Sequence, residues 1–212
     1  MYYYIFGVVI AGIIIWTIGS YTVIWTIEEP AYTVRENKDG YEIRDYAPYI
    51  KAEAEVTGTY QEATEQGFRI IADYIFGNNQ KRESISMTTP VLESPTENTS
   101  ENIAMTTPVL ESSNGTATRT IAFVLPSKYT LDTLPTPNNP AVKLTAVPAR
   151  TVAVLQYTWY PTEKRTDAKK EQLRSYLIRD KKVITGTTET ARYNPPLSMP
   201  LTLRNEIIIP IK

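Results

Sequence analysis

The hydrophobic pattern of this chain changes from strand spacing to helix spacing twice, and this repeated order is the strongest constraint on the fold. Apolar and polar residues alternate over residues 50–56, and over residues 59–75 the apolar positions recur at helical spacing. The same order returns with a strand pattern at residues 151–158 and a helical pattern at residues 167–180. Two strand patterns follow the helix in each half. We therefore expect an α+β fold in which two β-α-β-β units close one curved antiparallel sheet with two packed helices.

Local signals support these elements. Asp39-Gly40 is typical of a hairpin turn, and Thr59 with Glu62 has the spacing of a helix capping box. Gly77-Asn78 is expected to end the first helix. The further expected strands are residues 32–36, 41–46, 119–126, 142–147, 189–193 and 206–211, and the inward positions of the second helix are Leu173, Tyr176 and Leu177.

A tandem repeat follows the first helix. The sequence Ile-x-Met-Thr-Thr-Pro-Val-Leu-Glu-Ser occupies residues 85–94 and again residues 103–112, and only Ser86 and Ala104 differ between the copies. In an extended chain, the Ile and Met of each copy would face the same side, and the proline would end the strand or place it at a sheet edge.

Three arrangements are compatible with the repeat. In the simplest, a duplication lengthened a loop, so that one copy occupies the sheet and the other lies outside it. Alternatively, the two copies pair as a hairpin, or either copy can fill the same strand position. We therefore assign residues 93–118 as a duplicated-motif loop or hairpin insertion.

Composition excludes several classes of function. The chain contains no histidine and no cysteine, which removes the commonest metal ligands, the commonest general base and thiolate nucleophiles. The net charge is -1 and both signs are interspersed, which disfavours nucleic acid as a partner. No spacing assembles a nucleophile, a base and an oxyanion site, so we expect no enzymatic activity.

The N-terminal segment is apolar. No charged residue occurs between Tyr2 and Ile27, a stretch longer than the roughly 20 residues that span a bilayer core, and Glu28 and Glu29 close it. We predict a transmembrane anchor over residues 1–28 and a single-pass membrane protein whose remaining domain is extracytoplasmic. A cleaved signal peptide is the alternative, but no Lys or Arg precedes the apolar run.

Five short motifs occur in a fixed order along the remaining chain. They are Met-Thr-Thr-Pro-Val at residues 87–91 and 105–109, Phe-Val-Leu-Pro-Ser-Lys-Tyr at 123–129, Leu-Pro-Thr-Pro at 134–137, Ala-Arg-Tyr-Asn-Pro-Pro at 191–196 and Arg-Asn-Glu at 204–206. Through these motifs the chain resembles the SOUL haem-binding protein family, in particular bacterial-type members with an N-terminal membrane anchor. The resemblance implies a twisted, barrel-like sheet with two helices over residues 29–212, and non-covalent binding of haem or a related tetrapyrrole.

The resemblance also implies a ligand groove beside the first helix. The matching residues are Thr64, Phe68, Ile71 and Ile75 on the helix, Arg69 as its basic residue, and Met87 or Met105 on the following strand. The chain departs from the family in lacking a histidine ligand and in carrying Glu65 and Asp73 where other members carry basic residues. The apolar helix residues also have the spacing of an ordinary core, and the two methionines also suit packing.

The expected function is therefore that of a membrane-anchored carrier or buffer of tetrapyrrole, without His or Cys axial ligation. The alternative is a binding module for another apolar ligand, or for a protein partner, on the same scaffold.

Overall fold

Two β-α-β-β units share one sheet in this protein. The structure, a computed structural model, describes residues 27–81, 100–113, 118–195 and 198–212, with short pieces of chain before residue 18. The elements of the first part are β1 (Tyr32–Lys38), β2 (Tyr41–Tyr46), β3 (Tyr49–Thr57), α2 (Tyr60–Ile75), β4 (Asn79–Gln80), β5 (Val109–Ser113) and β6 (Thr118–Val124). Those of the second part are β7 (Thr136–Pro137), β8 (Lys143–Val147), β9 (Arg150–Tyr157), α3 (Glu163–Arg179), β10 (Glu189–Arg192), the 3-10 turn η1 (Pro200–Thr202) and β11 (Asn205–Pro210).

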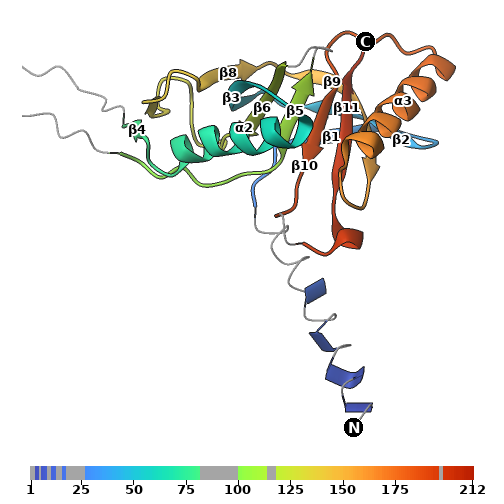
Figure 1. The fold of residues 1–212 in the computed structure, drawn as a ribbon. Coiled ribbons are helices and arrows are strands. Elements are labelled where there is room, and N and C mark those ends of the chain that lie inside the picture. Colours follow the sequence, from blue (N-terminus) through green and yellow to red (C-terminus); the bar gives the residue numbers. More distant parts are fainter. Residues whose placement is uncertain are drawn as a thin grey trace, which may run out of the picture.

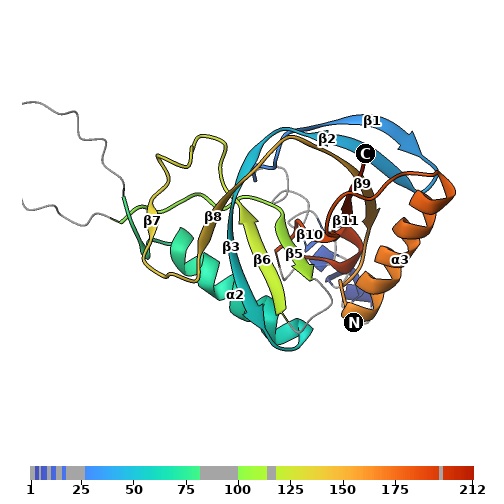
Figure 2. The ribbon, with the colours of Figure 1, turned by 90° about the horizontal axis from the view of Figure 1, so that it is seen from above.

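The sheet is antiparallel and curls into half a barrel (Figures 1 and 2). Nine of the described strands form it in the order β1-β2-β9-β11-β10-β5-β6-β3-β8, and β4 pairs with β7 outside it. The expected α+β fold, with a curled antiparallel sheet and two packed helices, is confirmed.

The strand order has an internal two-fold relation. The first unit is β3-α2-β5-β6 and the second is β9-α3-β10-β11. β5 and β10 pair at the centre, β6 and β11 flank them, and β3 and β9 lie next outward. Equivalent strands therefore occupy equivalent positions in the two halves, as the repeated element order predicted.

Both helices pack on the same face of the sheet. Ile121 and Phe123 of β6 lie in the core beneath α2, while Ala122 and Val124 point to the opposite face. The same alternation holds in β9, where Leu155 lies in the core beneath α3. The sheet therefore has one helix-covered face and one helix-free face.

The first helix has the predicted ends. Thr59 and Glu62 form the expected capping box, and the helix ends before Gly77, whose φ is +113°. Gly67 is buried against β6, where a Cβ atom would overlap the Ile121 side chain. Only glycine allows this close approach of α2 to the sheet.

The second helix begins earlier than predicted. Its N-cap is Thr162, whose hydroxyl accepts the Arg165 N–H at 3.3 Å, so the start expected at Asp167 is wrong by one turn. The missed turn is rich in charged residues, and apolar spacing alone does not mark it. Leu173 and Leu177 are buried and Tyr176 is half-buried, as expected.

The second repeat copy occupies the sheet. Its residues Val109–Ser113 form β5, which pairs with β6 on one edge and with β10 on the other. With both edges taken, β5 has no free edge for the hairpin between copies that we considered. The first copy, residues 85–94, lies outside the described residues, and so does Met87.

The expected extended Ile-x-Met strand is also wrong for the second copy. Residues 103–107 form no strand, and the strand starts only after Pro108, which has no N–H to donate. Ile103 is buried in the core beneath α2, whereas Met105 is 44% exposed. The two side chains therefore do not share a face.

The predicted membrane localisation requires correction. A helix needs about 20 apolar residues to cross a bilayer core. In the parts of the chain that the structure describes, no helix is long and apolar enough to do so. The predicted localisation as a single-pass membrane protein with an extracytoplasmic domain is therefore wrong; most of residues 1–28, to which the anchor was assigned, lie outside the described residues.

Candidate functional site

One flank of α2 faces the centre of the sheet. Tyr60, Thr64 and Phe68 follow one another at four-residue intervals, which places them on the same side of the helix. The Tyr60 hydroxyl accepts a hydrogen bond from Arg192 of β10, so this side faces β10 and its neighbour β5. The Thr64 hydroxyl donates to the Tyr60 carbonyl oxygen at 2.7 Å.

Residues 101–107 border the same flank. The Ile103 N–H donates to the carbonyl oxygen of Ile75 at 2.9 Å, which ties this segment to the last residue of α2. The Thr106 hydroxyl donates to the carbonyl oxygen of Val124, and the chain then enters β5. Figure 1 shows the segment running beside α2 towards β5.

Two apolar side chains remain exposed along this flank. Phe68 is 38% exposed, and its ring lies 5.1 Å from that of the buried Phe123, measured between centroids. Met105 is 44% exposed on the bordering segment. We call Thr64, Phe68 and Met105 the α2 flank.

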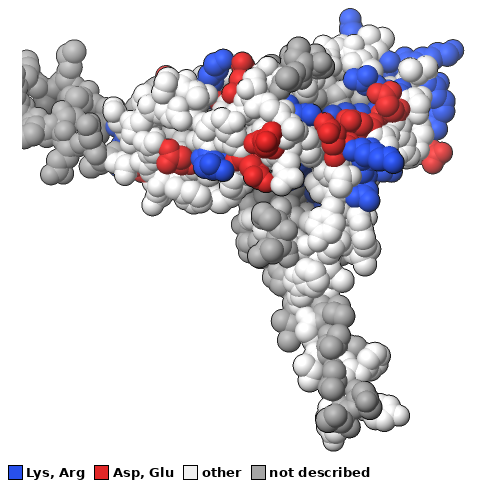
Figure 3. Space-filling model, viewed as in Figure 1, with Lys and Arg blue, Asp and Glu red and all other residues white. Residues whose placement is uncertain are grey.

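The remaining predicted residues lie elsewhere. Ile71 and Ile75 are fully buried in the core, which is the alternative that their spacing allowed. Arg69 is exposed and takes part in no ion pair recorded among the described residues. In the view of Figure 3, much of the surface over α2 carries neither sign of charge, while Lys and Arg gather towards the α3 end.

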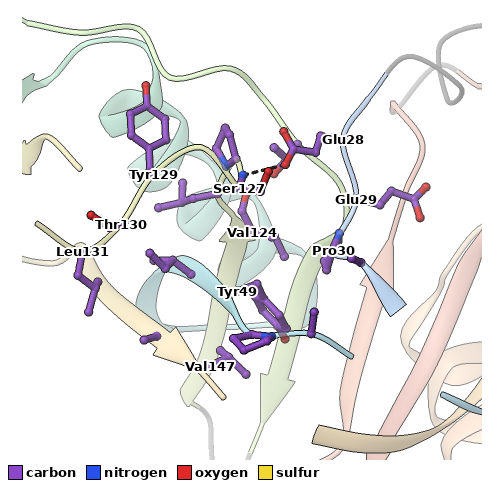
Figure 4. A pocket seen from close by; sticks show the side chains of 18 residues that line it. Glu28, Glu29, Pro30, Tyr49, Val124, Ser127, Tyr129, Thr130, Leu131 and Val147 are labelled. Carbon is purple, nitrogen blue, oxygen red and sulfur yellow. Dashed lines mark hydrogen bonds between the residues drawn. The ribbon is translucent and has the colours of Figure 1, made fainter. Parts of the chain in front are cut away.

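A second feature is a pocket of about 580 Å³ on the side of the sheet away from α2 (Figure 4). Its walls come from separate segments: residues 28–31, the chain from Ala47 into β3, residues 124–131, the end of β8, and Thr106. We call it the β3–β8 pocket. No predicted site residue lines it, and sequence periodicity could not have found it, because tertiary packing alone brings these segments together.

The carboxylates of the β3–β8 pocket differ in their partners. Glu28 accepts the Ser127 N–H at 2.7 Å, and Figure 4 shows it reaching towards that nitrogen. Glu29 is directed away and accepts two hydrogen bonds from Arg204, at 2.9 and 3.0 Å. Burial raises the pKa of Glu29, although Arg204 opposes the shift.

Two tyrosines complete the wall. The Tyr49 hydroxyl accepts a hydrogen bond from Arg150 at 2.7 Å, and the Tyr129 hydroxyl donates to Glu101 at 2.6 Å. Burial raises the pKa of both phenols, so both rings stay neutral and protonated at physiological pH. The phenols therefore contribute aromatic surface rather than charge.

Comparison with known sequences decides the family. Residues 27–99 and 94–210 each match the family described as SOUL heme-binding protein. The chain belongs to the SOUL family. Each matched segment contains one copy of the tandem repeat, which agrees with a SOUL domain that carries one inserted unit. No curated protein matches the sequence.

Solved structures similar to this SOUL domain share its fold at low sequence identity. The C-terminal domain of EcmrR has a TM-score of 0.57 at 9% identity, with 85% of this chain and 98% of that chain covered. A hydrolase from Listeria innocua has a TM-score of 0.50 at 13% identity, covering 84% of this chain and 94% of its own. An uncharacterized conserved protein from the same organism has a TM-score of 0.51 at 13% identity, covering 82% and 93%. These similarities show the fold alone.

Proposed function

We propose that this SOUL domain binds haem or a related tetrapyrrole non-covalently at the α2 flank, as a carrier or buffer. Membership of a haem-binding family is the observation that carries the proposal. The predicted residues Phe68 and Met105 support the location, because both leave apolar surface exposed beside α2. Ile71 and Ile75 do not contact the ligand in this proposal; they are buried between α2 and the sheet and hold the helix in place.

The residues of the α2 flank suit a flat apolar ligand with acidic substituents. Covering Phe68 and Met105 removes apolar surface from water, which favours binding by roughly 25 cal/mol per Å². Arg69 has no recorded ion-pair partner in the described chain, so its guanidinium is available to a propionate. Bound haem would supply its own iron chemistry, and the Met105 thioether is a side chain of a type that can contact the iron.

Axial ligation is weak in this proposal. Histidine and cysteine are absent from the sequence. Affinity therefore depends on apolar contact and on Arg69, and a bound ligand can be released as well as held. This combination suits transfer or buffering of a tetrapyrrole better than permanent retention.

The β3–β8 pocket suits haem less well. Its lining includes the carboxylates Glu28 and Glu29 and neither Lys nor Arg. Haem propionates are anions, and like charges repel one another in a site of low dielectric constant. We therefore assign the tetrapyrrole to the α2 flank.

Haem titration tests this assignment. Addition of haem to the 212-residue chain should shift the Soret band, and Phe68→Asp should abolish the shift, because a carboxylate replaces the central apolar contact. Met105→Leu should keep the affinity within about threefold if packing outweighs ligation. Arg69→Glu should weaken binding of haem more than binding of a porphyrin without propionates.

Ile178→Asp is the matched control. Ile178 is 76% exposed on α3, the other helix, so the same kind of change there should leave the Soret shift intact. Circular dichroism confirms that each variant is folded. The proposal fails if micromolar haem gives no shift, or if Ile178→Asp weakens binding as much as Phe68→Asp.

A further inference from the structure

We propose that the β3–β8 pocket is a second ligand site, separate from the α2 flank, and that it takes a bulky apolar organic cation held by Glu28. The ligand class is that of quaternary ammonium or phosphonium ions with aromatic or branched substituents. The proposal rests on the size, lining and charge of the pocket and does not depend on haem binding.

The size of the pocket suits a small organic molecule. Its volume of about 580 Å³ lies within the range of roughly 300–1,000 Å³ that is usual for ligand sites. Leu125 and Val124 belong to the core of the domain, and Tyr49 packs against the core of the helix-free face. One wall of the pocket is therefore fixed by the folded sheet.

The lining is largely apolar. The residues that present carbon surface are Pro30, Ala31, Ala47, Pro48, Ile50, Val124, Leu125, Pro126, Leu131, Ala146 and Val147. The rings of Tyr49 and Tyr129 add aromatic faces, and such faces attract cations as well as apolar groups. Water forms few hydrogen bonds with this apolar lining, so an apolar ligand can displace the water with little loss of free energy.

The carboxylates of the pocket favour a positively charged ligand. Glu29 is already neutralised by its two hydrogen bonds from Arg204. Glu28 is exposed and forms no recorded ion pair among the described residues, and the one recorded hydrogen bond to its carboxylate comes from the Ser127 N–H. A carboxylate has room for about four hydrogen-bond or charge contacts. Glu28 is thus held in place by the backbone while its charge remains open to a ligand.

The nearest cationic side chains do not neutralise Glu28. Arg150 is paired with Glu189 at 2.5 Å, and Arg204 with Glu29. Lys128 is exposed, lies over the Tyr129 ring at 4.7 Å from its centroid, and is not part of the lining. Water and salt screen its charge, and Glu28, which is exposed as well, differs from Lys128 in lining the pocket. The lining itself therefore offers negative charge and apolar surface together.

Two probes of equal shape and opposite charge test the proposal. Equilibrium dialysis of the 212-residue chain should show that tetraphenylphosphonium binds at least about tenfold more tightly than tetraphenylborate, which corresponds to 1.4 kcal/mol. Glu28→Gln should remove most of this preference by weakening the cation roughly tenfold. Prior saturation with haem should leave cation binding unchanged, because the two sites are separate.

Two further variants complete the experiment. Glu171→Gln makes the same chemical change on the exposed face of α3, remote from the pocket, and should leave both affinities unchanged. Ala146→Trp places an indole in the pocket from an exposed wall position and should weaken both probes. The proposal is overturned if neither probe binds at 100 μM (about -5.5 kcal/mol), if the borate binds as tightly as the phosphonium, or if Glu28→Gln changes nothing.

Discussion

At the scale of single residues, Glu206 is the side chain of the helix-free face that most needs charged and hydrogen-bonding partners. It is completely buried and accepts hydrogen bonds from Arg44 at 3.1 Å, from Arg204 at 3.0 Å and from the Tyr193 hydroxyl at 2.7 Å. Glu206→Gln removes the charge while Arg44, with 3% of its side chain exposed, stays buried. We expect a loss of about 3–5 kcal/mol in the free energy of unfolding. Urea denaturation monitored by circular dichroism measures it.

Glu42→Gln is the control for this network. Glu42 also binds Arg44, at 2.7 Å, but 39% of its side chain is exposed. Solvent screens such a contact, so its loss should cost less than about 1 kcal/mol. If Glu42→Gln cost as much as Glu206→Gln, burial of the carboxylate would not be the source of the stability.

One sequence motif contains part of this network. Arg204, which precedes β11, and Glu206 within it stand two positions apart in the Arg-Asn-Glu motif, and they form an ion pair at 3.0 Å. Arg44 was not predicted, because it lies 162 positions away and joins Glu206 only when β9 brings β2 and β11 into one sheet. Local spacing reveals pairs within an element, not pairs across a sheet.

At the scale of elements, one contact joins the first hairpin to the end of α3. The Tyr41 hydroxyl donates to Asp180 at 2.8 Å, and Arg179 donates to the same carboxylate at 2.8 Å. These hydrogen bonds, that of Arg179 first, lower the pKa of Asp180 to about 2. Burial, followed by the bond to Asp180, raises the pKa of Tyr41 to about 12. The hydrogen bond therefore persists from acid to alkaline conditions.

The depressed pKa of Asp180 predicts how the hairpin contact depends on pH. The folded-state pKa lies below the ordinary aspartate value of 3.8, so the stabilisation is present above that value and is lost as pH falls from about 4 to about 2. Denaturation should therefore show a stability gap between the natural protein and Asp180→Asn at pH 7 that closes towards pH 2. Asp39→Asn, whose exposed carboxylate is 3.9 Å from Arg179, should change stability much less at pH 7. A gap that widened in acid would contradict the assignment.

The elements themselves were largely predictable. The capping box of Thr59 and the turn at Asp39-Gly40 act within a few residues, so their sequence signals suffice. The start of α3 and the strand in the repeat were misplaced. The first turn of α3 is charged rather than apolar, and in the repeat the proline excludes the preceding residues from the sheet. In both cases a local feature that hydrophobic periodicity does not report, the N-cap Thr162 or the proline at residue 108, set the boundary.

At the scale of the whole molecule, the sequence predicted the two related halves but not the surfaces between segments. The repeated element order follows from local pattern, and the family fixes its arrangement. The β3–β8 pocket joins residues 28–31 to β3 and β8, and no local signal connects them. For the predicted ligand residues, burial was the missing quantity, since helical spacing cannot separate the buried Ile71 from the exposed Phe68.

The tandem repeat gives the last prediction. Asn79, in β4, bonds to Glu101 through its side chain, with Asn79 Nδ2 2.8 Å from the Glu101 carbonyl oxygen and the Glu101 N–H 3.0 Å from Asn79 Oδ1. These bonds hold the two ends of residues 82–99 close together. Removing residues 82–99 would delete the first copy and leave Gln80, Lys81 and Ser100 as a short connection, a length that tight loops readily adopt.

We therefore expect the deletion variant to fold, because the second copy already supplies β5 between β6 and β10. Its free energy of unfolding should stay within about 1 kcal/mol of the natural value, since loop-closure entropy changes slowly with length. Chemical denaturation measures this, and deletion of residues 103–113 is the contrasting variant, because it leaves only the first copy to fill β5. If that variant also unfolds cooperatively with native stability, the two copies are interchangeable in the sheet. If removal of residues 82–99 instead abolishes folding, the first copy is part of the fold rather than an inserted unit.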